Sequence, residues 1–428
     1  MTQRYDTYKD SGVQWLGEIP GHWKAIPVRR IAQVNPSKKK ELSPDDYVGY
    51  APMERIRCDQ MIPTRIKVSQ LTSGLTYCEQ GDIVLAKVTP CFENGNLAIV
   101  PKVENGCCYA SSELFVFRPK TNVLDRFLFY TFLNRSFIDA GASTMRGTGG
   151  LKRVTTEFAN TAATPLPPLS EQHSIVSYLD DKCGKIDKML EGKQKQIELL
   201  AEMKQRIIAD AVTHGLNPDV KMKATNIPWL PEIPEHWDVK RGKNLFNKEQ
   251  RPIEEGDEIV TCFRDGEVTL RKKRRTTGFT EATDYSHYQH ICKGDLVIHQ
   301  MDAFAGSSGV SDSDGMGTPV LSVCTARIEG VNHYYFAYIL RLMGKNNFIL
   351  SLYRGIRERS SDFRFETFAK QYLPVPPAIE QEQIVKFIHE RSSKIDALTS
   401  KLQQEIESIK EYKQRLISDV VTGQIKVC

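Results

Sequence analysis

The sequence contains the same signature twice. Pro165 to Gln172 reads Pro-Leu-Pro-Pro-Leu-Ser-Glu-Gln, and its prolines and its Glu-Gln pair return at Pro374 to Gln381, an offset of 209 residues. A second signature, Trp15 to Trp23, returns at Trp229 to Trp237. An internal repeat of this length constrains the architecture of a chain more strongly than any local sequence pattern does. The chain is therefore predicted to be a tandem duplication.

Each proline signature opens a long segment without proline, over 169–217 and from residue 378 onward. Apolar residues recur there at alternating spacings of four and three, the 3.5-residue period of a coiled coil. Two helices that pair with each other, each a rod of roughly 60 Å, are expected, with Ser170 as a candidate N-cap; two unrelated surface helices are the alternative. The predicted seam comprises Leu179, Ile186, Leu190, Ile197, Leu200, Ile207, Ile388, Ile395, Leu402, Ile406, Ile409 and Leu416.

The blocks between the signatures predict α+β domains with mostly antiparallel sheets. The first block has short β-like runs, then an aromatic helix at about 124–140 and a glycine-rich loop at 145–153. The second block repeats this plan, with a helix at 334–350 and a loop at 353–359. The predicted organisation is a leading segment at 1–23, a domain at 24–164, a helix at 165–217, a repeated leading segment at 218–237, a domain at 238–373 and a helix at 374–428.

The composition of the chain limits the classes of function that it can have. The chain has 428 residues, a net charge of +5 and a pI near 8.5, which permits an acidic partner such as nucleic acid. It contains no run of 18 apolar residues and no apolar core of a signal peptide, so no membrane association is expected. Its ten cysteines include no Cys-x-x-Cys pair, which predicts reduced thiols in a cytoplasmic protein.

A search for catalytic motifs fails. There is no phosphate-binding loop and no nucleophile elbow. Asp181, Glu191 and Lys193 resemble a nuclease carboxylate set only weakly, because they fall within a predicted helix. His287, His290 and Cys292 have ligand-type side chains but lack a fourth partner with metal-site spacing. No catalytic residue and no metal site are predicted.

Basic clusters in loops are the stronger signal. Loop-borne Lys and Arg neutralise phosphates, and Asn, Gln, Thr and His can read base edges; a solvated surface charge is the alternative for each residue. The candidates are Lys38, Lys39, Lys40, Lys87, Thr89, Asn94, Asn96, Arg146, Lys152, Arg153, Arg271, Lys272, Lys273, Arg274, Arg275, His299, Gln300, Arg354, Arg357, Arg359 and Arg364.

Taken together, the order and duplication of these signatures resemble the DNA-specificity (S) subunits of type I restriction–modification enzymes. The resemblance spans essentially the whole chain and includes the helix ends Lys204 to Asp210 and Lys413 to Asp419. It implies two target-recognition domains that each read one half of a bipartite DNA sequence. It also implies that the long helices pair antiparallel with pseudo-two-fold symmetry and set the gap between the half-sites.

The resemblance further implies partners and the absence of catalysis. The helices are expected to hold two modification subunits, which carry S-adenosylmethionine and methylate adenines, and a restriction subunit that uses ATP and Mg²⁺ can join. No cofactor is expected on this chain. The alternatives are a stand-alone nuclease or methyltransferase and a coiled-coil scaffold with no nucleic-acid role. DNA contacts vary within such a family, so the candidate residues depend on loop position and side-chain chemistry alone.

Overall fold

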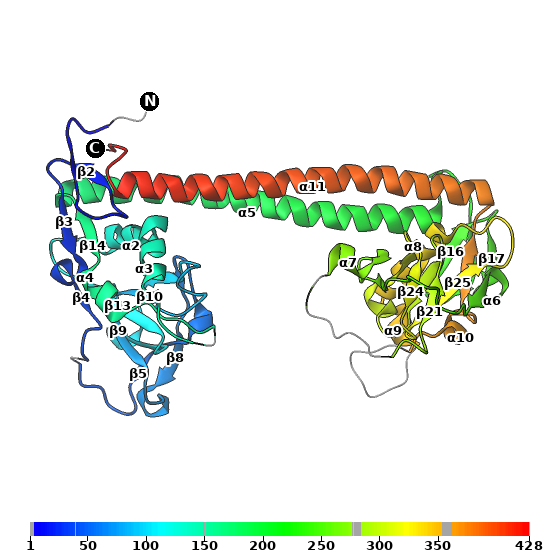
Figure 1. Cartoon of the computed structure of the whole chain (residues 1–428), viewed down its shortest axis with the longest axis horizontal. Helices are drawn as coiled ribbons and strands as arrows, with labels where there is room; N and C mark the ends of the chain where they lie inside the picture. Colours follow the sequence, from blue (N-terminus) through cyan, green and yellow to red (C-terminus); the bar gives the residue numbers. More distant parts are fainter. Residues whose placement is uncertain are drawn as a thin grey trace. The chain divides into compact units, whose positions relative to one another are not determined.

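A computed structural model describes residues 4–38, 40–148, 150–275, 277, 284–352 and 362–427. The chain forms two compact units (Figure 1). Unit 1 comprises Met1–Gln194 and Gln403–Cys428, and unit 2 comprises Lys195–Leu402. Each unit therefore contains one of the predicted domains, one leading segment and a part of both long helices.

Unit 1 is built on two four-stranded sheets, in the orders β11-β10-β13-β4 and β8-β5-β12-β9. The pairing is antiparallel, as predicted, except between β5 and β12, which run parallel. The β-like runs that the sequence shows at 47–50, 83–85, 97–100 and 114–117 become β5, β10, β11 and β13. The strands are β1 (Tyr8–Asp10), β2 (Glu18–Pro20), β3 (Lys24–Pro27), β4 (Ala32–Val34), β5 (Tyr47–Ala51), β6 (Ile56–Arg57), β7 (Gln60–Met61), β8 (Thr64–Lys67), β9 (Thr76–Glu79), β10 (Ile83–Ala86), β11 (Leu97–Ile99), β12 (Cys107–Ala110), β13 (Leu114–Pro119) and β14 (Ala163–Leu166).

The predicted single aromatic helix of unit 1 is two helices, so that prediction was wrong. Helix α2 (Asp125–Leu133) ends at Asn134, and α3 (Arg135–Ser143) begins there. The side chain of Asn134 accepts a hydrogen bond from the backbone N of Ser136 at 2.8 Å. An asparagine that caps a new helix stops the previous one, because its oxygen satisfies an amide left without an intrahelical partner. The short helices α1 (Val28–Ile31) and α4 (Thr156–Thr161) complete this domain.

Unit 2 repeats the plan around one four-stranded antiparallel sheet, β18-β25-β22-β23. Its strands are β15 (Met222–Ile227), β16 (Leu230–Pro234), β17 (Asp238–Arg241), β18 (Phe246–Glu249), β19 (Val260–Cys262), β20 (Val268–Leu270), β21 (Gln289–Ile291), β22 (Leu296–His299), β23 (Ser308–Val310), β24 (Gly315–Gly317), β25 (Leu321–Ala326) and β26 (Tyr372–Val375). Its short helices are α6 (Gly242–Leu245), α7 (Arg271–Arg274), α9 (Phe348–Ser351) and α10 (Phe365–Phe368).

The aromatic helix of unit 2 is also shorter than predicted. Helix α8 (His333–Lys345) begins after Asn332, whose side chain accepts hydrogen bonds from the backbone N of Tyr334 and Tyr335. It ends before Asn347, which has a left-handed φ of 57°. Asparagine tolerates that conformation better than most residues, so it is a natural position for a break between α8 and α9.

The two long helices are α5 (Leu169–His214, 46 residues) and α11 (Ala378–Val421, 44 residues). Ser170 lies inside α5 and is not its N-cap, because Gln172 N already donates to Pro168 O at 3.0 Å. The twelve predicted seam positions are all buried or half-buried, whereas Met189 and Leu199 on the other face of α5 are exposed. The 3.5-residue period thus describes how these helices bury their apolar residues.

Two ion pairs show that α5 and α11 run antiparallel in unit 1, and an equivalent pair forms in unit 2. In unit 1, Lys413 Nζ lies 2.6 Å from Asp187 Oδ1, and Lys193 Nζ lies 2.5 Å from Glu405 Oε2. In unit 2, Lys204 Nζ lies 2.7 Å from Asp396 Oδ1. The Lys413 and Lys204 pairs are equivalent under the 209-residue offset. The duplicated sequence therefore makes a duplicated contact.

The Glu-Gln pair at the start of each long helix fastens the helix to its domain. Gln172, which is fully buried, accepts a hydrogen bond from Leu124 N at 2.9 Å and donates to Pro167 O at 2.9 Å and Asn122 O at 3.2 Å. Leu124 is the residue before α2. The repeated glutamine thus holds the start of the aromatic helix against the start of α5.

In unit 2 the equivalent glutamine makes equivalent hydrogen bonds. Gln381 Oε1 accepts from Asn332 N at 2.9 Å, directly before α8, and its Nε2 donates to Pro376 O at 2.8 Å. The neighbouring Glu380 lies 2.7 Å from His236 Nε2 in the repeated leading segment.

The leading segment of unit 1 is held in the equivalent way. Glu171 is 2.6 Å from His22 Nε2 and accepts from Trp23 Nε1 at 2.9 Å. Trp23 and Trp237 are both fully buried, each in the core of its own unit.

The nine cysteines within the described residues are all free thiols. Across that part of the chain, no helix has both the length and the apolar character that a bilayer crossing needs.

Candidate nucleic-acid interface

Unit 1 brings two candidate loops together. The segment after β10 lies against the segment that follows the glycine-rich loop, because Thr89 N donates to Lys152 O at 2.9 Å and Val154 N donates to Lys87 O at 2.8 Å. Arg146 and Arg153 pair across the neck of the glycine-rich loop. These contacts gather Lys87, Thr89, Arg146, Lys152 and Arg153, which we call the basic loop surface.

Gly147 makes the turn of this loop possible. Its φ is +144°, and a Cβ added there would lie 2.4 Å from Leu151 O. A side chain at this position would force the loop open, so the backbone path that presents the basic loop surface needs glycine.

The charges of the basic loop surface are only partly neutralised. Arg153 binds Glu113 with two hydrogen bonds of 2.8 Å, which holds the pKa of that carboxyl below its ordinary value. Arg146 and Lys152 are exposed, and neither forms an ion pair with any residue that the structure describes. Lys87 is half-buried above the ring of Phe115. An exposed cation held on a braced loop is suited to binding phosphate.

The other candidates of unit 1 differ in how exposed they are. Asn94 is exposed, but Asn96 is buried, with 8% of its surface exposed, and its position argues against a base contact. Lys38 is exposed, and Lys40 donates to Asn105 O at 2.7 Å. Lys39 falls outside the described residues.

Unit 2 forms an equivalent junction with different side chains. Phe363 N donates to Gln300 O at 3.0 Å, which matches the bond between Val154 and Lys87. Gln300 also donates from its side chain to Pro319 O and Ser322 Oγ. Arg364 is exposed and lies 2.6 Å from Asp362. Arg354, Arg357 and Arg359 of the same loop lie outside the described residues.

His299 is held in a neutral form at this junction. Burial lowers the pKa of its ring, and its Nδ1 accepts a hydrogen bond from Asp302 N at 3.1 Å. A ring that accepts at Nδ1 carries its proton at Nε2, so it presents a hydrogen-bond donor without charge.

Asp302 itself is paired with Arg264 at 3.0 Å. Arg264 is an exposed cation beside this loop that sequence reasoning missed, because nothing along the chain links it to His299.

The run Arg271 to Arg275 differs from expectation. We predicted a cationic stretch between β-like runs, and it instead forms the helical turn α7 with its charges largely paired. Lys272 binds Glu258, Lys273 binds Asp312, and Arg274 binds Asp265 and Glu267. Arg271 Nε and Arg275 Nε contact Thr261 and Thr277. Four carboxylates thus offset much of the local positive potential.

The two weak enzyme-like motifs have structural explanations. Asp181 binds Lys185 on the same face of α5, and Lys193 binds Glu405 on α11, so the nuclease-like set consists of helix ion pairs. The histidine motif splits: His287 is exposed, while His290 and Cys292 form a group with Asp314 whose ligand atoms lie within 4.8 Å of one another. Asp314 was missed because strand pairing, not sequence spacing, brings it there.

Comparison with known families agrees with the duplicated fold. The family model described as "Type I restriction modification DNA specificity domain" matches residues 21–199 and 266–408. These two stretches include most of both recognition regions and parts of both long helices.

Curated relatives carry the same description. The chain is 33% identical over 195 residues to the type I restriction enzyme EcoAI specificity subunit of Escherichia coli, which covers 43% of this chain and 33% of that protein. The match to the EcoEI subunit covers 32% of that relative, so the chain spans only about a third of the length of either. The MjaVIII specificity subunit of Methanocaldococcus jannaschii is 23% identical over 428 residues, 96% of this chain and 94% of the relative.

Two solved structures share the fold. One is a chain from a structural study of complex assembly and conformational transition of the type I R-M system, with a TM-score of 0.71 and 18% identity over 94% of this chain and 98% of that one. The other is the HsdS subunit of Thermoanaerobacter tengcongensis, with a TM-score of 0.53 and 19% identity over 95% and 98% of the two chains.

Proposed function

Since this chain belongs to the family of type I restriction–modification DNA specificity domains, we propose that it is the DNA sequence-specificity subunit of a type I restriction–modification complex. The observation that carries the proposal is the presence of two equivalent units, both matched by the family model. Each unit reads one half of a bipartite double-stranded DNA sequence. The chain itself catalyses nothing.

The loops at the two equivalent junctions are the DNA-reading elements. In unit 1 the basic loop surface supplies cations for phosphates, and the exposed Asn94 can reach a base edge. In unit 2 the junction offers a neutral donor, His299, beside Arg264 and Arg364. The two junctions share a backbone plan but differ in side chains, which supports two different half-sites.

The long helices connect the two readers and hold partner subunits. We propose that α5 and α11 set the gap between the half-sites and bind two modification subunits. S-adenosylmethionine belongs to those subunits, and ATP and Mg²⁺ belong to a restriction subunit that can join. Exposed apolar residues on the outer faces, such as Met189, Leu199, Met203 and Leu398, support a role in subunit binding.

A change of the basic loop surface tests the DNA-binding role. Replacing Lys87, Arg146 and Lys152 together by glutamine is expected to weaken DNA binding by roughly 10–100-fold and to lower the salt slope by about one for each phosphate contact removed. The measurement is fluorescence anisotropy of duplex DNA with the full complex, across a series of salt concentrations.

A matched variant controls for total charge. Replacing Lys9, Lys24 and Lys102 by glutamine removes the same charge from exposed positions of unit 1 elsewhere, and binding should then change little. Replacing Lys272, Lys273 and Arg274 should have a smaller effect than the first variant, because acidic neighbours already pair with them. Equal losses from the first variant and the control would refute a contact at the basic loop surface.

A further inference from the structure

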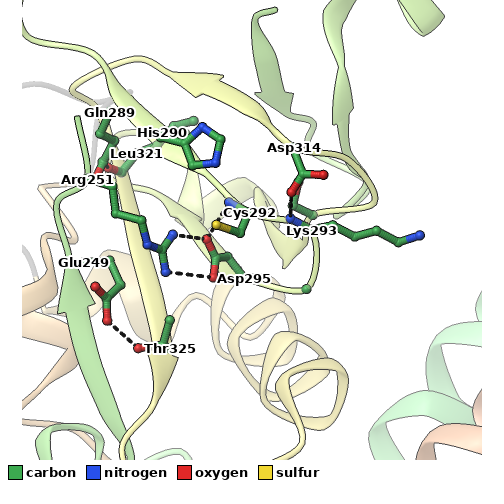
Figure 2. Close-up of polar contacts among 12 residues, drawn as sticks. Glu249, Arg251, Gln289, His290, Cys292, Lys293, Asp295, Asp314, Leu321 and Thr325 are labelled. Carbon is green, nitrogen blue, oxygen red and sulfur yellow. Dashed lines mark hydrogen bonds and ion pairs between the residues drawn. The ribbon is translucent and has the colours of Figure 1, made fainter. Parts of the chain in front are cut away.

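Three potential metal ligands lie on one face of unit 2. His290 is on β21, and Cys292 follows two residues later, so strand alternation turns both side chains to the same side. The register pairs Ile291 with Gly315, so Asp314, directly before β24, lies opposite Cys292, directly after β21. One ligand atom from each of the three residues lies within 4.8 Å of the others (Figure 2).

The carboxylate of Asp257 orients the imidazole of His290. Its Nδ1 lies 2.9 Å and 3.1 Å from the two carboxylate oxygens of Asp257, and both side chains are 8% exposed. Asp257 in turn accepts from Glu254 N at 2.9 Å. A carboxylate at one ring nitrogen fixes the tautomer and leaves Nε2 as the nitrogen that can bind a cation, which is the usual outer-shell arrangement of metal-binding histidines.

Backbone contacts fix the other two ligands. Cys292 N donates to Asp295 at 2.8 Å, and Lys293 N donates to Asp314 Oδ1 at 2.8 Å, which leaves the second oxygen of Asp314 for a ligand. Asp295 is already neutralised by Arg251, with contacts at 2.5 Å and 3.3 Å (Figure 2). The charge that an arriving cation would meet is therefore that of Asp314, and deprotonation of Cys292 on binding adds a second negative ligand.

We propose that His290, Cys292 and Asp314 bind one zinc ion, which is independent of the DNA-reading role. Imidazole, thiolate and carboxylate are all ligands of Zn²⁺, whereas Mg²⁺ and Ca²⁺ prefer oxygen alone. On binding, the Cys292 thiol loses its proton to solvent and the sulfur coordinates the ion, so two negative ligands balance the dication.

Zinc binding requires only a small decrease in the distances between the three ligand atoms. Ligand atoms at about 2.0–2.3 Å from a tetrahedral Zn²⁺ lie roughly 3.3–3.8 Å from one another. The three ligand atoms already lie within 4.8 Å of one another, so they need to approach by about 1 Å. Water fills the fourth position, with Glu254 Oε1 nearby at 3.9 Å from His290 Nε2. The ion would pin the ends of β21 and β24 together directly before β22, the strand that leads to His299.

Cobalt substitution is the direct test. The full-length chain is stripped with a chelator, reloaded with Co²⁺ or Zn²⁺ alone, and freed of excess metal. We expect about one equivalent to be retained and Co²⁺ to give a thiolate charge-transfer absorption. Cys292→Ser should abolish that absorption, and Asp314→Asn should weaken Zn²⁺ binding at least tenfold in a competition with a chelating dye.

Cys58→Ser is the matched control, because Cys58 is an exposed thiol in unit 1, and it should leave metal retention and the absorption unchanged. The metal-free Cys292→Ser protein should unfold at the same temperature as the metal-free parent, which separates lost ligation from misfolding. Zn²⁺ should raise the unfolding temperature of the parent but not of this variant. Retention well below one equivalent, or an absorption that survives Cys292→Ser, would overturn the proposal.

Discussion

Replacing Gln172 by alanine is expected to destabilise unit 1 by at least about 3 kcal/mol. Gln172 is fully buried, and the change would remove the hydrogen bonds that its side chain makes with Leu124 N, Pro167 O and Asn122 O. A buried polar group left without a hydrogen bond costs about 1–3 kcal/mol. The affected contact joins the start of α2 to the start of α5, so the recognition region should loosen from the helix.

Chemical denaturation of the full-length chain, with hydrogen exchange to localise the change, measures this effect. Gln194→Ala is the control, because Gln194 is exposed on the same helix, and it should stay within about 0.5 kcal/mol of the parent. Gln381→Ala should produce the equivalent loss of protection in unit 2 rather than in unit 1. A Gln172→Ala protein as stable as the control would show that these hydrogen bonds do not hold the domain.

Exchanging residues 24–164 for the corresponding region of another family member is expected to replace one half of the recognised sequence and leave the other half unchanged. Unit 1 and unit 2 each have their own core, and the exchanged block begins at β3 and ends within β14, the strand that pairs with β3. Methylation at the parental sites should fall to background, and sites with one new half should appear.

The reciprocal exchange of residues 238–373 is the matched control and should change the opposite half only. In each chimaera the glutamine at the start of the long helix, Gln172 or Gln381, needs hydrogen-bond partners in the new domain. The donor domain should therefore retain the turn before its aromatic helix. A chimaera that changes both halves, or neither, would contradict independent reading by the two units.

The sequence was sufficient for the features that depend on periodicity or repetition. The alternating four-and-three spacing picked out the apolar stripe that the long helices bury, from Leu179 to Leu416, because a helix buries whichever stripe is apolar. The offset of 209 residues singled out Glu171, Gln172 and their copies before any contact was known. Their role in fastening each domain to a long helix needed the structure.

Features that depend on distant partners could not be predicted. The charges of Lys272, Lys273 and Arg274 are offset by carboxylates from other strands and turns, and no local pattern reveals such pairing. Asp314 joins His290 and Cys292 only through the register of β21 and β24. By contrast, Asn134 and Asn347 were visible in the sequence as helix breakers, and giving them more weight would have shortened both aromatic helices.

Mapping of adenine methylation tests the central claim most directly. DNA from cells that express this chain with a modification subunit should carry methylation at a single split motif, two short sequence blocks separated by a fixed gap. The two blocks should respond separately to changes in unit 1 and unit 2. Methylation of one continuous motif, or none at all when the chain and the modification subunit form a folded complex, would contradict the account.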